Sequence, residues 1–131
     1  MILAVDASAI VAIALGEPEA STIESCLWEA AEAYATPINL VEAGLALVLR
    51  RGHFRADEFS VWVKEQRILE RHIDGSDALH AYLLYGRGVH RAGLNLGDCF
   101  AYALAKQLDA PLLYKGDDFA FTDVRPALQP T

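Results

Sequence analysis

Cysteine is the first residue type that this sequence nearly lacks. Its 131 residues include only Cys26 and Cys99, and these two do not form a Cys-x-x-Cys pair. A scaffold held together by disulfides and a cysteine-based zinc site are therefore excluded. We expect both thiols to be buried as small apolar side chains in a reducing compartment.

Long apolar runs are absent as well. No stretch approaches the ~20 apolar residues that a membrane-spanning helix requires. The first 15 residues are largely apolar, but they lack a basic start and Asp6 interrupts them, so they do not match a secretory signal. We expect a cytoplasmic protein that does not associate with a membrane.

Positive charge is also scarce. The sequence has 11 Lys and Arg against 18 Asp and Glu, which gives a formal net charge of −7, and no basic residue precedes Arg50. This balance excludes a protein that coats DNA by general electrostatic attraction, because such binding needs many Lys and Arg side chains. An enzyme that acts on nucleic acid is still compatible with it, since a metal ion can offset the charge of an acidic site.

Short apolar runs alternate with helical segments, and this alternation predicts the fold class. Strands are expected at residues 2–5, 34–36, 68–73, 111–114 and 123–125. Helices are expected at 9–15, capped by Ser8, and at 18–33, 37–51, 57–69, 76–86 and 96–108. Such alternation implies parallel strands joined by right-handed crossovers. We predict an α/β protein, a three-layer α/β/α sandwich with a central, mainly parallel sheet, formed by residues 1–131 as a single domain.

Acidic residues stand where the expected strands end or the expected helices begin, which is where parallel sheets bind ligands. They are Asp6, Glu42, Asp98, Asp117 and Asp118. Glu42 is the only charged residue between Pro37 and Leu49, so it is not part of an ordinary solvated helix face. Two carboxylates ~4 Å apart repel by about 4 kcal/mol at an effective dielectric constant of ~20. A site that gathers several of them must bind a cation or keep some protonated, and oxygen ligands favour Mg²⁺ or Mn²⁺ over zinc.

Four segments occur in the order that is typical of PIN domains. They are Val5-Asp6-Ala7-Ser8-Ala9, the apolar helix with Glu42, the stretch from Leu94 to Ala105, and Pro111-Leu112-Leu113-Tyr114-Lys115-Gly116-Asp117-Asp118-Phe119. Over essentially its full length the chain resembles a VapC-type toxin ribonuclease of a bacterial toxin–antitoxin pair. The resemblance implies a PIN-like fold and a Mg²⁺-dependent endoribonuclease that forms a homodimer. It also implies an RNA substrate and inhibition by a VapB-type antitoxin encoded beside the toxin.

The resemblance also assigns roles to individual residues. By position, Asp6, Glu42 and Asp98 would bind the metal ion, with Ser8 as a polar support for Asp6. A fourth acid of many PIN domains falls here on Gly116, so Asp117 or Asp118 would replace it, with Asp117 slightly favoured. Asn95 would shape its loop by hydrogen bonding or serve as a simple turn residue. Candidates for contacts to RNA phosphates are Arg50, Arg51, Arg87, Arg91 and Lys115.

These assignments predict hydrolysis of an RNA phosphodiester by a metal-activated water. Asp6 and Asp98 would hold the principal ion, while Glu42 and Asp117 would complete its shell or orient the water. Two alternatives are a phosphatase that forms a phosphoaspartate and a non-catalytic module whose acidic pocket binds a basic peptide. Phosphatases of that family share an Asp-x-Asp motif after their first strand. In this sequence Ser8 stands where the second aspartate of the motif should be. A docking surface would not need carboxylates at all of these positions.

Overall fold

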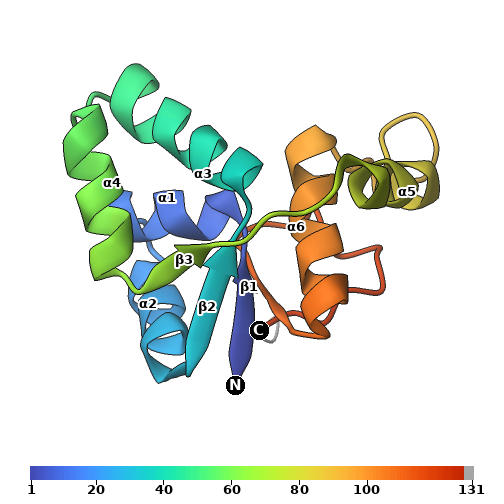
Figure 1. The fold of residues 1–131 in the computed structure, drawn as a ribbon, viewed down its shortest axis with the longest axis horizontal. Coiled ribbons are helices and arrows are strands. Elements are labelled where there is room, and N and C mark those ends of the chain that lie inside the picture. Colours follow the sequence, from blue (N-terminus) through green and yellow to red (C-terminus); the bar gives the residue numbers. More distant parts are fainter. Residues whose placement is uncertain (129–131) are drawn as a thin grey trace.

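The computed structural model describes residues 1–128, in which strands and helices alternate along the chain (Figure 1). The strands are β1 (Ile2–Val5), β2 (Glu32–Ala35), β3 (Ile68–Glu70) and β4 (Leu112–Leu113). The helices are α1 (Ala7–Leu15), α2 (Ala20–Glu29), α3 (Pro37–Gly44), the π-helix η1 (Leu45–Arg50), α4 (Ala56–Glu65), α5 (Gly75–Tyr85) and α6 (Leu96–Leu108). Within residues 1–128, no helix has the length and apolar character needed to cross a membrane.

The four strands form one parallel sheet in the order β3-β2-β1-β4. Successive side chains of β1 point to opposite faces, as in any strand. Leu3 and Val5 therefore join a core with α1 to α4, whereas Ala4 joins a second core with α5 and α6. Figure 1 shows the two helical layers on either side of the sheet. The predicted α/β/α arrangement with a central parallel sheet is confirmed.

Helix α6 is the most extensively buried helix, and it packs against α5, α3 and β1. Its start is capped by Asn95, whose side-chain oxygen accepts a hydrogen bond from the Asp98 backbone N–H at 2.8 Å. Cys99 is fully buried in this helix, and Cys26 is buried in α2, as the composition predicted. The burial of α6 fixes the position of whatever its first turn carries.

Two expected helix boundaries are wrong. Ser8 does not cap α1; the cap is Asp6, whose carboxylate accepts the Ser8 backbone N–H. The helix expected at 18–33 begins at Ala20 and ends at Glu29, because Glu32 already pairs with Ile2 as the first residue of β2.

Two further boundaries also differ from the prediction. The helix expected at 57–69 ends at Glu65, where Arg67 takes a left-handed conformation with φ of 65° and leads into β3. The helix expected at 37–51 is an α-helix only to Gly44 and continues as the π-helix η1, in which the Arg51 N–H donates to the Ala46 carbonyl at 3.0 Å.

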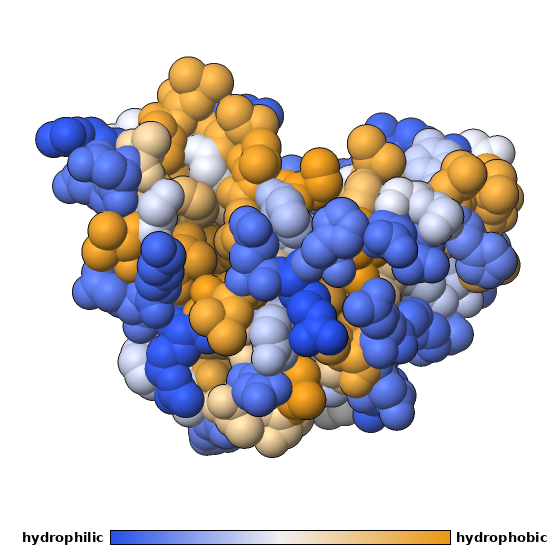
Figure 2. Space-filling model, viewed as in Figure 1, coloured by the Kyte–Doolittle hydropathy of each residue, from blue (hydrophilic) through white to orange (hydrophobic). Residues whose placement is uncertain are grey.

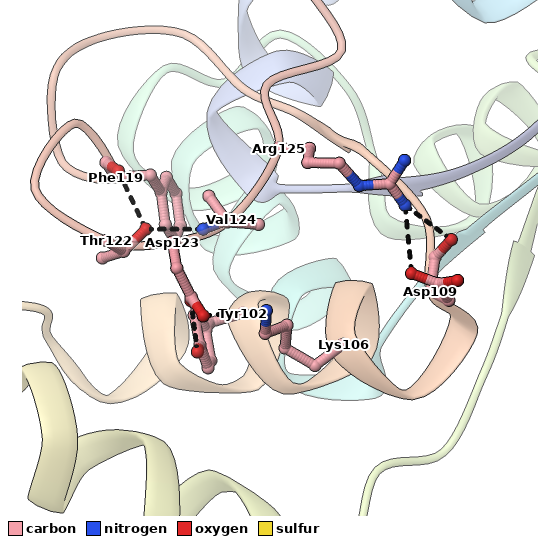
Figure 3. A network of polar contacts seen from close by, with 8 residues as sticks. All are labelled: Tyr102, Lys106, Asp109, Phe119, Thr122, Asp123, Val124 and Arg125. Carbon is pink, nitrogen blue, oxygen red and sulfur yellow. Dashed lines mark hydrogen bonds and ion pairs between the residues drawn. The ribbon is translucent and has the colours of Figure 1, made fainter.

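The strand expected at 123–125 is absent from the part of the chain that the structure describes. Residues 125–127 run beside Leu112, which exchanges two backbone hydrogen bonds with Arg125 and Ala127. The pairing of Leu112 with Pro126 is a single parallel bridge that does not extend into a strand. The segment is instead tied to α6, because the Asp123 carboxylate accepts hydrogen bonds from Tyr102 at 2.6 Å and Lys106 at 3.0 Å (Figure 3).

Candidate active site

Four of the five predicted acidic residues gather at the carboxyl ends of the parallel strands: Asp6, Glu42, Asp98 and Asp118. Figure 1 shows the end of β1 and the starts of α1, α3 and α6 converging above the strand arrowheads. The molecular surface is hollowed between the part built by α3 and η1 and the part built by α5 and α6 (Figure 2). This hollow is the candidate active site.

Asp6 is held in place by the residue two positions further along. Its Oδ2 accepts hydrogen bonds from the Ser8 backbone N–H at 3.0 Å and from the Ser8 hydroxyl at 2.6 Å. Burial raises the pKa of Asp6 above its usual range, and the charge of Asp118 raises it further, while the Ser8 hydrogen bonds act against this increase. A buried carboxylate with an acidic neighbour is a group that a cation would stabilise.

Ser8 also connects Asp6 to a distant loop. Its Oγ accepts a hydrogen bond from the Lys115 backbone N–H at 3.0 Å while donating to Asp6. The expected supporting role of Ser8 thus has a physical form: one hydroxyl joins the start of α1 to the segment that follows β4.

Glu42 is positioned by a polar network that the sequence analysis missed. The amide nitrogen of Asn39 donates to Glu42 Oε1 at 3.1 Å and to the Gly97 carbonyl at 3.0 Å. Asn39 is itself held by Thr36, which caps α3 and donates from its hydroxyl to Asn39 Oδ1 at 2.6 Å. Thr36 and Asn39 are fully buried. The available signal was an asparagine three residues before the lone acid of an otherwise apolar helix.

Gly97 is a second residue that the sequence analysis missed. A Cβ at this position would overlap the Glu42 carboxylate, so only glycine lets Glu42 lie against the first turn of α6. Glu42 thereby comes close enough to Asp98 and Asp6 for their charges to interact. Burial is the main cause of the raised pKa of Glu42, and the charge of Asp6 adds to it.

Asp98 is the acid whose pKa is affected by the charges of all the other acids in the cluster. It is buried in the first turn of α6, where its Oδ2 accepts the Asn95 backbone N–H at 3.1 Å. Burial, together with the charges of Asp6, Asp118 and Glu42, raises the pKa of Asp98 to about 7 in spite of that hydrogen bond. Asn95 completes a reciprocal capping box, which agrees with the loop-shaping role expected for it.

The two candidates for the fourth acid, Asp117 and Asp118, differ in which side chains their charges act on. The charge of Asp118 acts on both Asp6 and Asp98. The charge of Asp117 acts instead on Tyr114, and Asp117 lines a separate cavity of about 790 Å³ beside the start of α2. Gly116, with φ of 98°, turns the chain between them and Lys115. The geometry therefore favours Asp118 over Asp117 as the fourth member of the cluster.

The donor set is chemically suited to a hard divalent cation, because every side chain in it offers carboxylate oxygens. The acids raise one another's pKa, which a bound cation would reverse. Among residues 1–128, no three acidic, histidine or cysteine side chains stand close enough to hold one ion between them. The residues fit Mg²⁺ or Mn²⁺ by chemistry, and binding would require the carboxylates to draw closer together.

The five expected phosphate contacts are not equivalent. Arg50 and Arg51 are exposed at the end of η1, and Arg87 is exposed on the loop that leads to Asn95. On the same loop, the Arg91 guanidinium lies 4.4 Å from the centre of the Phe121 ring. The Lys115 ammonium, by contrast, lies 3.1 Å from Glu17 and 3.2 Å from Glu19.

An apolar groove of about 760 Å³ lies apart from the acids, between α3, η1, α4 and β3. Only Lys64 and Glu70 carry charge among its lining residues. Val41, Leu45 and Leu49 line it and are 58%, 42% and 74% exposed, and Figure 2 shows apolar side chains gathered over this region. The groove lacks the groups needed for catalysis, but an apolar segment of another chain would fit it.

Comparisons with known proteins match the whole of this architecture. The family model of the PIN domain matches residues 3–124. Ribonuclease VapC30 of Mycobacterium tuberculosis is 37% identical over 131 residues, covering 98% of this chain and 100% of that protein. Ribonuclease VapC of Mycolicibacterium smegmatis is 38% identical over 125 residues, covering 93% and 97%.

The crystal structure of Mycobacterium tuberculosis VapC20, described as a sarcin-ricin loop cleaving toxin, superimposes with a TM-score of 0.69. It covers 96% of this chain and 100% of that one. At 21% identity this likeness establishes the shared fold.

Replacing Asp98 by asparagine is expected to stabilise the metal-free protein at pH 8. The pKa of Asp98 is about 7 in the folded state, against about 3.9 for an unfolded aspartate. Its contribution to stability is therefore full below pH ~4 and is lost as the pH rises through ~7. Asparagine can still accept the Asn95 N–H but carries no charge. The variant should gain about 1–3 kcal/mol in unfolding free energy at pH 8 and nothing at pH 4.

Urea denaturation in EDTA at both pH values measures this difference. If the unfolding free energies of variant and wild type differ by the same amount at pH 4 and at pH 8, the pKa of Asp98 is not raised by its surroundings.

Proposed function

This chain belongs to the PIN domain family, and within it to the VapC ribonucleases. From that membership we propose that it is a Mg²⁺-dependent endoribonuclease that acts as the toxin of a toxin–antitoxin pair. The observation that carries the proposal is the cluster of Asp6, Glu42, Asp98 and Asp118 at the end of the sheet, in which the pKa values of Asp6, Glu42 and Asp98 are raised by burial and by the charge of neighbouring acids. The substrate is RNA, and the bond broken is a phosphodiester.

The four acids would hold Mg²⁺ or Mn²⁺. When bound, the ion would supply Lewis-acid stabilisation of the phosphodiester and lower the pKa of a water ligand. The protein's own contribution is to hold one oxygen of each of three carboxylates in a defined place. Ser8 does this for Asp6, Asn39 for Glu42 and the Asn95 backbone for Asp98. Preorganisation of this kind reduces the entropy lost when metal and substrate are brought together.

Contacts to the RNA phosphates are best supplied by arginines on the rim of the hollow. Arg87 and Arg91 lie on the loop that leads directly into Asn95 and α6, and Arg50 and Arg51 end η1. With a net charge of −7, the protein has no broad electrostatic attraction for RNA. These few contacts should therefore give a shallow dependence of RNA affinity on salt.

The phosphatase alternative is disfavoured by the position of Ser8. A phosphoaspartate mechanism would need Asp6 as a free nucleophile with a second carboxylate two residues later. Here the Asp6 Oδ2 accepts two hydrogen bonds from Ser8 instead. The non-catalytic alternative predicts metal binding without RNA cleavage.

The proposed partner is a VapB-type antitoxin. An apolar segment of it would fill the groove between α3, η1 and α4, and a basic side chain near the carboxylates would compete with the metal ion. We further propose that the protein is a homodimer in the cytoplasm. Leu79 and Leu83 leave an apolar surface on α5, 60% and 61% exposed, that a second copy could cover.

Replacement of the individual acids tests the function. Asp98→Asn should abolish RNA cleavage, and Asp118→Asn should lower it by about 10²-fold or more, because each removes a charge from the metal site. Asp117→Asn should lower the rate by less than about 3-fold, since its charge does not reach the cluster. The measurement is kcat/KM on a single-stranded RNA with Mg²⁺, repeated in EDTA. Cleavage that persists in EDTA, or equal losses for Asp117→Asn and Asp118→Asn, would contradict the proposed site.

Gly97→Ala tests the close approach of Glu42 to α6. The new methyl group should force the Glu42 carboxylate away from Asp98 and lower cleavage by at least about tenfold. Gly75→Ala is the matched control: Gly75 is at the start of α5 and has open space around the position of a Cβ. In a Glu42→Ala background, adding Gly97→Ala should lower the cleavage rate little further. If Gly97→Ala and Gly75→Ala have the same activity, Glu42 has no part in catalysis through this contact.

The groove is tested by charge placed on its rim. Leu45→Glu and Leu49→Glu should each weaken binding of the co-expressed antitoxin by about 10- to 100-fold, because a charge would have to be buried in the complex. Val61→Glu is the control, since Val61 is 58% exposed on α4 but does not line the groove. Calorimetry measures the affinity, and RNA cleavage by each free variant checks that the site is intact. Unchanged affinity in both leucine variants would place the antitoxin elsewhere.

A further inference from the structure

The segment that carries Asp118 is fixed at both of its ends. At one end the Lys115 ammonium lies 3.1 Å from Glu17 Oε1 and 3.2 Å from Glu19 Oε2. At the other end Phe119 is 2% exposed, with its ring centre 5.0 Å from that of Tyr114. Only residues 116–118 lie between these anchors, so the direction in which Asp118 projects depends on them.

Lys115 contacts structure at both ends of α1. Its backbone N–H donates to the Ser8 hydroxyl at 3.0 Å, next to the Asp6 cap where the helix begins. Its ammonium reaches Glu17 and Glu19, which follow the Gly16 cap where the helix ends. Gly16 has φ of 61°, and its N–H bonds back to the last turn of α1, so the two glutamates are held to a rigid element.

The double ion pair is better shielded than an ordinary surface pair. The side chains of Lys115 and Glu17 are 35% and 28% exposed, and the Glu19 side chain is 48% exposed. One ammonium shared between two carboxylates forms a small network, and networks contribute more than isolated exposed pairs do. With both glutamates bound, this ammonium is also the least available of the five predicted phosphate contacts.

We propose that Lys115 is a positioning residue that aligns Asp118 and the Ser8–Asp6 pair, and that it does not bind the RNA phosphates. The inference rests on the proposed function, because it concerns the geometry of the same carboxylates. Removing the ammonium frees the start of the segment from α1, and Asp118 then loses its fixed position relative to Asp6 and Asp98. The backbone hydrogen bond to Ser8 weakens for the same reason.

The two roles for Lys115 predict different kinetics. For a positioning residue, Lys115→Met should lower kcat by about 10- to 100-fold with KM changed by less than about 2-fold. For a phosphate contact, KM and the RNA dissociation constant should rise instead. The slope of log affinity against log salt for a single-stranded RNA should then fall by about 0.7. Binding of a fluorescein-labelled RNA in EDTA measures this slope without any turnover.

Four further variants make the test decisive. Lys115→Arg should retain most of the activity, because it keeps a cation between the two glutamates. Glu17→Gln with Glu19→Gln should reproduce the loss from the opposite side of the ion pair. Lys106→Met is the matched control: it breaks a comparable lysine–carboxylate pair with Asp123 at 3.0 Å on α6 (Figure 3) and should leave kcat unchanged. In an Asp118→Asn background, Lys115→Met should cost much less than it does in the wild type.

Amide hydrogen exchange gives a readout that does not depend on cleavage. Exchange of the residue 115 N–H, which donates to the Ser8 hydroxyl, should be faster in Lys115→Met than in the wild type and unchanged in Lys106→Met. If the wild type cleaves RNA and Lys115→Met has normal kcat or a reduced salt slope, the positioning role is wrong while the proposed function stands. If the wild type and Asp98→Asn both fail to cleave RNA, the proposed function itself is overturned.

Discussion

The free-energy cost of ionising carboxylates that lie buried or half-buried beside one another is the constraint on which the rest of this structure depends. Asp6 caps α1, Glu42 lies on α3 and Asp98 on α6, and the three come together at the carboxyl ends of the parallel strands. Each has a pKa raised mainly by burial and further by acidic neighbours. Such a cluster opposes folding in the absence of a cation. The surrounding polar groups are arranged so that the acids are nevertheless kept in place.

These supporting groups come from segments far apart in the chain. Asn39 links Glu42 to the Gly97 carbonyl of α6, and Ser8 links Asp6 to the Lys115 backbone. Asp6 and Glu42 are thus each linked through an uncharged side chain to a neighbouring element, whereas Asp98 is held by the Asn95 backbone N–H of its own helix cap. The burial of α6 against α5, α3 and β1 keeps the whole edge rigid. These bonds keep the carboxylates near one another without a cation, and binding of one would need only a further approach of their oxygens.

Features governed by local rules could be predicted from the sequence. The apolar run that ends at Asp6, the lone Glu42 and the Asn95 cap of α6 each have a signature within a few residues. The Thr36–Asn39 network and the role of Gly97 could not be predicted, because they depend on a contact between α3 and α6. The choice between Asp117 and Asp118 depends on the turn at Gly116 and on ion pairs between Lys115 and glutamates about 100 residues earlier.

The most direct test of the central claim is a count of the protons released when the metal ion binds. Calorimetric titration of the metal-free protein with Mn²⁺, in buffers of different ionisation enthalpy, gives this number at each pH. With the pKa of Asp98 at about 7, binding should release about half a proton or more at pH 7 and almost none at pH 9. Binding without proton release at pH 7, or no binding at all, would contradict the account of carboxylates held together against their own repulsion.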